Sequence, residues 1–520
     1  MKLKRTKNAT RNIVFGMTLK IYQSAMPFLV RTAMIYFMGV EYLGLDSLFV
    51  SILQVLNLAE LGVGSAMVFG MYKPIVEDDT VTICALMKLY RTYYRIIGLV
   101  IAVVGLALTP LIPRLIKSDL PPELNIYVLY WLNLAATVFS YWLFAYKNAL
   151  FQAHQRNDVV SKINLVTYTL RYIVQFIIIF FIKDYYLYII AVLATQILTN
   201  IITAVAAARI YPNYKAQGEL DKKLVHVING RIRDLFTAKI GSVVVNSADT
   251  VVVSAFLGLT VLAVYQNYYF ILTAIIGFVT VIFQACTAGI GNSIVVETKE
   301  KNFNDLKKFT FLIAWIAGFC TCCLLCLYQP FMQIWVGEDL MLGFSAVICF
   351  CVYYFVYEIN QLLNTYKDAA GIWHEDRFRP LVTAGANLVM NLIMVQFWGI
   401  YGVLLSTVLS TLIVGMPWLL HNLFTVLFSK PQLKSYLKKL VLYTVITVVS
   451  CAVTYAICTP IHLGKWPLLI VRGVICCMVP NLIYFIVYHK TVEFKQCLQL
   501  LDQITKGKLK IEKRLAKITK

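Results

Sequence analysis

The feature that most constrains this chain is a succession of long apolar segments, each about as long as a lipid bilayer is thick. A membrane-spanning helix needs about 20 apolar residues. Of the 520 residues, 60% are hydrophobic and only 14% are charged, whereas an average globular protein has about 25% charged residues. A soluble fold cannot hide that much apolar side chain, because its surface must be covered by polar groups. We therefore predict an all-α polytopic membrane protein with about fourteen transmembrane helices.

The apolar segments and the loops between them also predict how the chain is divided. The predicted spans are residues 13–38, 43–70, 90–112, 124–148, 159–182, 185–208, 235–257, 260–294, 308–330, 340–364, 380–398, 400–428, 439–460 and 466–488. They predict a basic N-tail (1–12), an N-lobe (13–208), an inter-lobe linker (209–234), a C-lobe (235–428), an extra pair of spans (439–489) and a basic C-tail (490–520). No small-residue cleavage site follows the first apolar segment, so we interpret it as a retained span and not as a signal peptide.

The distribution of basic residues predicts the orientation in the membrane. The formal net charge is +21, which in a soluble protein would suggest nucleic-acid binding. With the N-terminus in the cytoplasm, most Lys and Arg side chains fall in the two tails and the cytoplasmic loops. The exceptions in outside loops are Arg114, Lys117, Lys183 and Lys465. The positive-inside rule therefore favours a protein of the cytoplasmic membrane with both termini in the cytoplasm, and we expect membrane lipids, not nucleic acid, as partners.

The sequence matches itself at an offset of 219 residues. The segment Phe37–Val40 (FMGV) corresponds to Phe256–Leu259 (FLGL), and Lys20 corresponds to Lys239. At an offset of 218, the loop 153–158 falls on the loop 371–376. Each half contains six predicted spans, an even number, so both copies enter the membrane in the same direction. We therefore expect two parallel six-helix lobes related by an axis along the membrane normal.

Ionisable residues inside the predicted spans are candidates for a binding site, because burying a charge in a membrane costs several kcal/mol. In the first span, Lys20, Ser24, Pro27 and Arg31 lie within about 60° on one helical stripe. Other spans also have one polar face; the second, for example, places Asp46, Asn57 and Glu60 on one side. The candidate substrate-binding residues are Lys20, Arg31, Glu60, Arg171, Lys239, Asp249 and Glu358.

These polar faces predict a water-filled cavity between the two halves, with cations at more than one depth. Arg and Lys suit a phosphate or pyrophosphate, and the acids could hold a coupling ion, H⁺ or Na⁺. Two other interpretations are open. The charges could pair with one another and only fix helix packing, and the lysines Lys20 and Lys239 could extend to the membrane surface.

A cysteine-rich segment, Cys320–Cys326 (CTCCLLC), imitates a metal-binding motif. Leu, Ile and Phe surround it, and no His or carboxylate accompanies it in the sequence. We interpret these cysteines as small apolar residues of a helix and expect no metal site and no disulfide. No GxxxxGK[ST] nucleotide-binding motif is found, so we also expect no cofactor.

Four segments carry a resemblance to a known family. They are Glu41–Phe49 (EYLGLDSLF), Glu60–Ala66 (ELGVGSA), Lys239–Thr250 (KIG through ADT) and Lys367–Gly371 (KDAAG). Together they are similar to the polysaccharide biosynthesis flippases of the multidrug/oligosaccharidyl-lipid/polysaccharide exporter superfamily. The resemblance covers residues 10–430.

The resemblance implies two six-helix lobes, alternating access and movement of undecaprenyl-pyrophosphate-linked oligosaccharides from the inner to the outer leaflet. It also implies that Arg31, Glu60, Lys239 and Asp249 line the cavity. The two spans after residue 430 depart from the twelve-span pattern and resemble fourteen-span members, including lipid II-type flippases, where such spans form a groove for the lipid tail.

Two other functions compete with this prediction. A multidrug exporter of the same superfamily would have a cavity of acids and aromatic residues for cationic drugs, whereas here the cations in the spans are at least as numerous. A membrane-embedded glycosyltransferase or polymerase would need catalytic groups on a sizeable outside loop, and the predicted outside loops are short. We therefore expect a transporter and not an enzyme.

Overall fold

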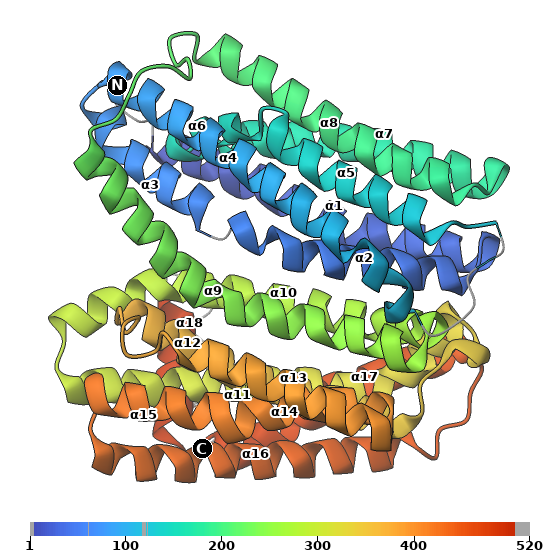
Figure 1. Cartoon of the computed structure of the whole chain (residues 1–520). Helices are drawn as coiled ribbons and strands as arrows, with labels where there is room; N and C mark the ends of the chain where they lie inside the picture. Colours follow the sequence, from blue (N-terminus) through green and yellow to red (C-terminus); the bar gives the residue numbers. More distant parts are fainter. Residues whose placement is uncertain (1–4, 61, 117–120, 122, 505–520) are drawn as a thin grey trace. The chain divides into compact units, whose positions relative to one another are not determined.

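The computed structural model is helical throughout the part of the chain that it describes, which is residues 5–60, 62–116, 121 and 123–504 (Figure 1). Within some helices only the backbone of certain residues is described, Lys239 among them. Each predicted span falls on one or more of these helices, and no strand occurs in the described ranges. The prediction of an all-α fold is confirmed.

The chain forms two compact units, Met1–Gln266 and Asn267–Lys520. The helices of the first unit are α1 (Arg5–Phe37), α2 (Val40–Leu56), η1 (Asn57–Glu60), α3 (Val63–Val76), α4 (Thr80–Leu108), η2 (Thr109–Leu115), α5 (Ile126–Trp142), η3 (Ala145–Lys147), α6 (Asn148–Ala153), α7 (Asn157–Ile177), η4 (Ile178–Ile182), α8 (Tyr185–Ile210) and α9 (Lys222–Leu257). Helix α10 (Leu259–Val296) begins in the first unit and continues in the second. The rest of the second unit consists of α11 (Lys299–Trp335), η5 (Glu338–Leu340), α12 (Phe344–Ala369), α13 (Arg379–Trp398), α14 (Ile400–Ser410), η6 (Thr411–Gly415), α15 (Met416–Val426), α16 (Lys430–Cys458), α17 (Lys465–Tyr488) and α18 (Val492–Ile504). The predicted lobe boundaries, 13–208 and 235–428, stay predictions.

The helices have the length and hydrophobicity of membrane spans. Among the described residues, ten helices are long and apolar enough to cross a bilayer, or eleven if α5 and the bent segment Ala145–Ala153 count as one span. Large apolar side chains cover their outer faces, and Phe181 and Phe397 are 82% and 77% exposed. Such surfaces are stable only in lipid. The protein is therefore a multi-pass membrane protein, while the number fourteen stays a prediction.

The starts of corresponding helices reproduce the offset found in the sequence. Helix α2 begins at Val40 and α10 at Leu259, an offset of 219, and the same offset separates the starts of α4 and α11. Before α2 and α10 stand Gly39 and Gly258, with φ angles of 132° and 93°. A residue with a side chain rarely adopts such angles, so glycine allows the chain to turn between two helices at both places.

The second predicted span is broken in the middle. Helix α2 ends at Leu56, a single 3₁₀ turn follows, and Gly62 has the left-handed φ of 89° before α3 begins. The expectation that Asp46 and Glu60 share one helical face assumed a continuous helix. The two acids lie in different segments and have different neighbours, so that expectation is wrong.

In the second unit, the last long helices pack on α11. Helices α16, α17 and α18 all contact α11, and α16 also contacts α17. Phe494 of α18 stacks on Trp315 of α11 with ring centroids 5.7 Å apart, and Glu493 forms an ion pair with Lys439 of α16. The helices that follow the repeat are therefore part of the second unit's packed core.

Candidate functional site

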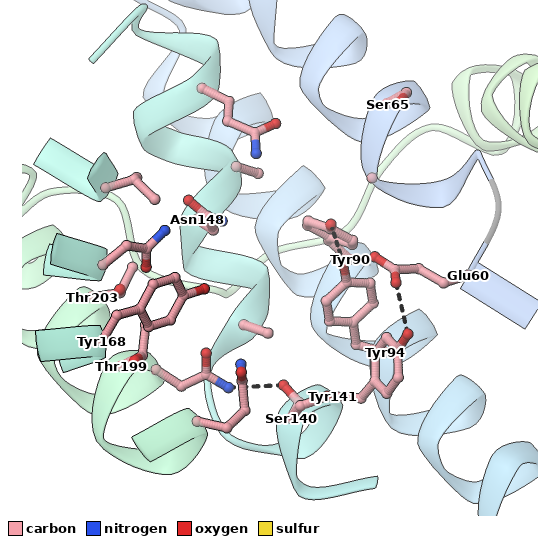
Figure 2. A pocket seen from close by; sticks show the side chains of 18 residues that line it. Glu60, Ser65, Tyr90, Tyr94, Ser140, Tyr141, Asn148, Tyr168, Thr199 and Thr203 are labelled. Carbon is pink, nitrogen blue, oxygen red and sulfur yellow. Dashed lines mark hydrogen bonds between the residues drawn. The ribbon is translucent and has the colours of Figure 1, made fainter. Parts of the chain in front are cut away.

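A polar cavity of about 450 Å³ lies inside the first unit (Figure 2). Its walls come from η1, α3, α4, α5, α6, α7 and α8. Glu60 lies on one wall, and Asn164, Tyr168, Thr199 and Asn200 lie on others. Of the predicted site residues whose side chains the structure describes, only Glu60 lines this cavity, and the predicted cavity between the two halves stays a prediction.

Glu60 is held in this cavity by tyrosines. The Tyr94 hydroxyl donates to Glu60 Oε1 at 2.5 Å, and the Tyr141 hydroxyl donates to Oε2 at 2.7 Å. The Tyr90 hydroxyl in turn donates to the Tyr94 oxygen at 2.6 Å. These are the short distances of hydroxyls that donate to a carboxylate. The tyrosines come from α4 and α5, so the broken second span brings Glu60 to a site built by two other helices.

The break in the helix explains why Glu60 can reach these tyrosines. In a 3₁₀ turn the backbone is wound more tightly than in an α-helix, and the side chain directions change accordingly. Asn57, at the other end of the same turn, also accepts a hydrogen bond from Tyr141, at 3.1 Å. The expectation that Asn57 and Glu60 face the same way is therefore confirmed.

A second charged cluster lies in the same unit and joins α1, α2, α7 and α8. Asp46 interacts electrostatically with Arg31 and Arg171, and Tyr188 interacts with all three. The Arg171 guanidinium donates from Nη2 to the Tyr172 hydroxyl at 2.9 Å. The described cluster therefore brings two cations, Arg31 and Arg171, to the same aspartate.

Arg171 also connects the cluster to the polar cavity. Its guanidinium lies 4.8 Å from the ring centre of Tyr168, which lines the cavity. Its Nε is buried and has no hydrogen-bond partner among the described residues. An unsatisfied donor on a buried cation is costly, and an anion that entered from the cavity side would remove that cost.

Sequence reasoning missed the central position of Asp46, but a signal for it exists. Arg31 and Asp46 lie at nearly equal distances from Gly39 along the chain. In two antiparallel helices joined by a short turn, residues equally far from the turn are neighbours. No comparable signal points to Tyr94 and Tyr141, because the chain contains 32 tyrosines.

The other predicted residues are not all part of this cluster. Lys20 is exposed on α1, and Asp249 is partly buried on α9. The side chain of Lys239 lies outside the described residues. Glu358 belongs to α12 in the second unit, where it is completely buried and neither carboxylate oxygen has a hydrogen-bond partner among the described residues.

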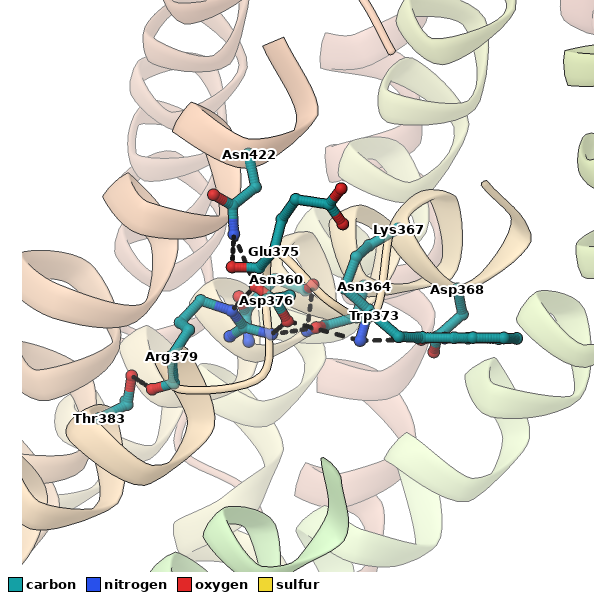
Figure 3. Close-up of polar contacts among 10 residues, drawn as sticks. All are labelled: Asn360, Asn364, Lys367, Asp368, Trp373, Glu375, Asp376, Arg379, Thr383 and Asn422. Atoms are coloured by element: carbon teal, nitrogen blue, oxygen red, sulfur yellow. Dashed lines mark hydrogen bonds and ion pairs between the residues drawn. The ribbon is translucent and has the colours of Figure 1, made fainter. Parts of the chain in front are cut away.

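The two loops matched by the internal repeat both contain a buried aspartate. In the second unit, Asp376 accepts hydrogen bonds from Arg379 Nε at 2.6 Å and Nη2 at 2.7 Å, and from Asn422 at 3.0 Å (Figure 3). In the first unit, Asp158 accepts from Arg156 Nε at 2.9 Å. These aspartates fix the loops between consecutive helices and do not line the polar cavity.

His154 lies in the first of these loops, four residues before Asp158. Burial lowers the pKa of His154, while the backbone oxygen of Leu150, 2.8 Å from Nδ1, acts against that shift. Its ring lies 4.4 Å from the ring centre of Tyr211. His154 is therefore neutral at pH 7 and is a packing residue.

Comparisons with known proteins agree with this fold. The family profile described as polysaccharide biosynthesis protein matches residues 9–287, more than half of the chain. A search of curated protein sequences finds no match.

Among solved structures, the lipid II flippase MurJ in an inward closed conformation is similar over 92% of this chain and 100% of that chain, with a TM-score of 0.64 at 15% identity. A multidrug resistance MATE family transporter in an inward-facing conformation is similar over 79% of this chain and 96% of that chain, with a TM-score of 0.61 at 13% identity. A Vibrio cholerae MATE transporter, VcmN, is similar over 81% of this chain and 97% of that chain, with a TM-score of 0.52 at 16% identity.

The apolar helices, the polar interior of the first unit and the family match lead to one conclusion. This chain belongs to the polysaccharide biosynthesis protein family and has the polytopic fold seen in MurJ and the MATE transporters.

Proposed function

We propose that the protein is a flippase that moves an undecaprenyl-pyrophosphate-linked oligosaccharide across the cytoplasmic membrane by alternating access, for cell-surface polysaccharide biosynthesis. The family match and the likeness to a lipid II flippase support this substrate class. The observation that carries the proposal is the cluster of Arg31, Asp46 and Arg171 inside the first unit.

The chemistry of this cluster suits a pyrophosphate. A guanidinium offers parallel N–H donors that match two phosphate oxygens, and it stays charged inside a protein. Asp46 keeps the two arginines together without cancelling their charge, so the cluster attracts an anion. The substrate enters from the polar cavity and meets the buried Nε of Arg171. In this proposal Lys20 and Lys239 attract the anion before it reaches the cluster.

The buried acids are our candidates for the coupling ion, H⁺ or Na⁺. A carboxylate buried without a partner is stable only when a proton or a cation neutralises it. Glu358 meets that condition, since both of its oxygens are buried and have no hydrogen-bond partner among the described residues. Glu60 and Asp249 are further candidates, but tyrosines already occupy both oxygens of Glu60.

The second unit offers a place for the lipid part of the substrate. A cavity of about 510 Å³ lies between α11, α12, η6, α15 and α16, and apolar side chains such as Phe344, Phe355 and Leu440 line it. We assign this cavity to the polyprenyl chain, because an apolar lining gives a hydrocarbon chain the same kind of surroundings as the bilayer and leaves no polar group unpaired beside it.

One observation favours a second function, export of cationic drugs. Glu60 and the tyrosines Tyr90, Tyr94 and Tyr141 form the combination of an acid and aromatic rings that binds organic cations. The MATE likeness agrees with it. The two arginines grouped with Asp46 suit an anionic substrate better than a cationic one, so we rank drug export second and a membrane-embedded glycosyltransferase third.

Complementation of a flippase-deficient bacterium tests the first proposal. The Arg31→Gln variant keeps most of the side chain's length and polarity but loses its charge. Losing one hydrogen bond to a charged group costs about 1.5–3 kcal/mol, so we expect transport to fall about tenfold or more. Arg31→Lys should retain part of the activity. Asp46 also interacts with Arg171, so in both variants it keeps at least one cationic neighbour.

The exposed Arg209 of α8 provides the control, because Arg209→Gln removes the same charge elsewhere in the unit. Protein levels in the membrane are measured for each variant. If Arg31→Gln is expressed normally and restores surface polysaccharide fully, the cationic-cluster mechanism is wrong. If the wild-type chain fails to complement but confers resistance to cationic drugs, drug export is the better assignment.

The orientation can be tested separately. We propose that both termini are in the cytoplasm and that Lys465 is outside. A cysteine placed at position 465 should therefore react with a membrane-impermeant thiol reagent added to intact cells, with native cysteine labelling of the wild-type chain as background. Labelling that requires permeabilised cells would reverse the orientation.

A further inference from the structure

Three buried cysteines from three helices converge in the second unit. Cys326 of α11, Cys458 at the end of α16 and Cys476 of α17 place their sulfur atoms within 4.8 Å of one another. All three are almost completely buried. The sequence brings only Cys326 from the cysteine-rich segment; its two partners come from helices that follow the repeat.

The surroundings of these sulfurs combine apolar packing with a nearby cation. Cys323, one turn before Cys326 on α11, packs against the cluster. The Cys476 thiol donates to the backbone oxygen of Cys322 at 3.9 Å. Arg472 of α17 interacts electrostatically with Cys476 and Cys458. The Nε of Arg472 is buried and has no hydrogen-bond partner among the described residues. A cation beside two of the three thiols stabilises their sulfurs in the thiolate form.

Three thiolates form a donor set for a soft metal ion. Cys ligands select Cu(I), Zn²⁺ and iron–sulfur clusters, whereas harder ions prefer oxygen. Structural zinc sites need four ligands in a tetrahedron, and here three sulfurs lie at mutual contact distance. Three sulfurs around one ion, at a metal–sulfur distance of about 2.3 Å, would be about 4 Å apart. The sulfurs therefore need only a small inward shift.

We propose that Cys326, Cys458 and Cys476 form a binding site for a single thiophilic metal ion, with Cu(I) as the ion that fits best. Binding replaces the three thiol protons, which are released, and gives a site of net charge −2 that Arg472 partly offsets. The ion fastens α16 and α17 to α11. This inference does not rest on the proposed transport function.

The test uses the purified, reduced full-length chain in detergent, with Cu(I) supplied anaerobically in competition with a chromogenic Cu(I) chelator. We expect one Cu(I) per chain and an X-ray absorption spectrum with a shell of three sulfurs. Cys476→Ser should lose this binding, and Arg472→Gln should weaken it about tenfold or more, as loss of an outer-shell partner does. Cys497→Ser is the matched control, because Cys497 is a buried thiol of the same unit outside the cluster.

Two results would overturn the proposal. One is Cu(I) binding that is equally strong in Cys476→Ser and Cys497→Ser. The other is an absorption spectrum of the wild-type chain with fewer than three sulfurs around copper, which needs no variant and so does not depend on whether a variant folds. Thermal unfolding gives a further readout, since an ion that binds only the folded chain must raise the unfolding temperature.

Discussion

The cavities of the two units have similar volumes, about 450 and 510 Å³, but walls of opposite chemistry. Glu60, asparagines and tyrosines line the first, whereas aliphatic and aromatic side chains, together with a few threonines and cysteines, line the second. The starts of α2 and α10, and of α4 and α11, nevertheless repeat at an offset of 219. The apolar cavity is lined in part by α16, which lies beyond the predicted repeat, so part of the difference comes from helices that only the second unit contains.

Each unit also contains acids that differ in how firmly neighbouring groups hold them. Glu60 is held by two tyrosine hydroxyls, whereas Glu358 has no hydrogen-bond partner among the described residues. Asp376 is surrounded by buried partners, whereas the partners of Asp158 are more open to solvent. A carboxylate with fixed donors serves structure, and one without them is free to exchange a proton or a cation. Under the proposed function, this difference separates residues that hold the fold from residues that act in transport.

The largest effect is expected in the loop of the second unit. Asp376→Ala leaves the Arg379 side chain, which is only 8% exposed, without its bidentate partner. Removing one member of a buried ion pair costs about 3–5 kcal/mol. We expect this variant to show a strongly lowered unfolding temperature, measured on the purified protein in detergent, or to be recovered at low levels.

The matching variant in the first unit, Asp158→Ala, should lose less. Its partners Arg156 and Lys162 are 26% and 43% exposed, so water can solvate them after the aspartate is removed. We expect the free energy of unfolding to fall by about 1–2 kcal/mol. As a control, Asp339→Ala removes an exposed acid and should hardly change the free energy of unfolding. Equal losses for Asp158→Ala and Asp376→Ala would show that burial of the cationic partner does not decide the cost.

Glu60→Gln should destabilise the first unit by an intermediate amount. In the amide, only one of the two hydroxyls of Tyr94 and Tyr141 keeps an oxygen acceptor, which is no longer charged, while the other faces an NH2 donor. A hydrogen bond to a charged group is worth about 1.5–3 kcal/mol. A double-mutant cycle with Tyr94→Phe measures the coupling directly. Additive losses of the two variants would mean that the 2.5 Å contact between them contributes no specific energy.

Glu358→Gln should have almost no effect on stability, because its oxygens have no hydrogen-bond partners to lose among the described residues. Replacing a buried acid by a neutral amide of similar shape can even be stabilising. If Glu358 binds the coupling ion, the same variant should nevertheless lose transport in the complementation assay. A fall in unfolding temperature as large as that of Glu60→Gln would contradict the distinction drawn between the two acids.

The smallest expected effect is on the local stability of the first turns of α4 and α11. The residues that cap these two helices stand at the same place in the repeat. Asp79 caps α4 by accepting from the Thr82 amide, and Thr298 caps α11 by accepting from the Lys301 amide. The hydrogen bonds from the Thr82 hydroxyl and amide lower the pKa of Asp79. A lowered pKa in the folded state means that the carboxylate's contribution is complete above the usual aspartate pKa and is lost as the pH falls through the lowered one.

Hydrogen exchange, expressed relative to the intrinsic rate at each pH, measures this difference. Protection of the first amides of α4 should decrease in acid, whereas protection at the start of α11 should not, because a threonine hydroxyl does not titrate in this range. Asp79→Asn keeps a capping oxygen and should abolish the pH dependence. If α4 and α11 respond alike, the carboxylate cap is not the cause.

The amino-acid sequence by itself determined the membrane-spanning helices, their grouping into a repeat and several of their ends. Hydropathy is a property of each segment, so it predicts a span without knowledge of its neighbours. Gly39 and Gly258 mark helix turns for the equally local reason that a positive φ favours glycine. Arg31 was also found from the sequence, because a charge within an apolar segment is conspicuous.

Only the tertiary structure decided which side chains meet. The position of Asp46 between two arginines, the contact of Glu60 with Tyr94 and Tyr141, and the convergence of Cys326, Cys458 and Cys476 all join helices that are distant in the sequence. Such contacts depend on the rotation and offset of each helix against its neighbours. Hydropathy sets neither of these, because a helix can turn about its axis or slide along it while remaining equally apolar.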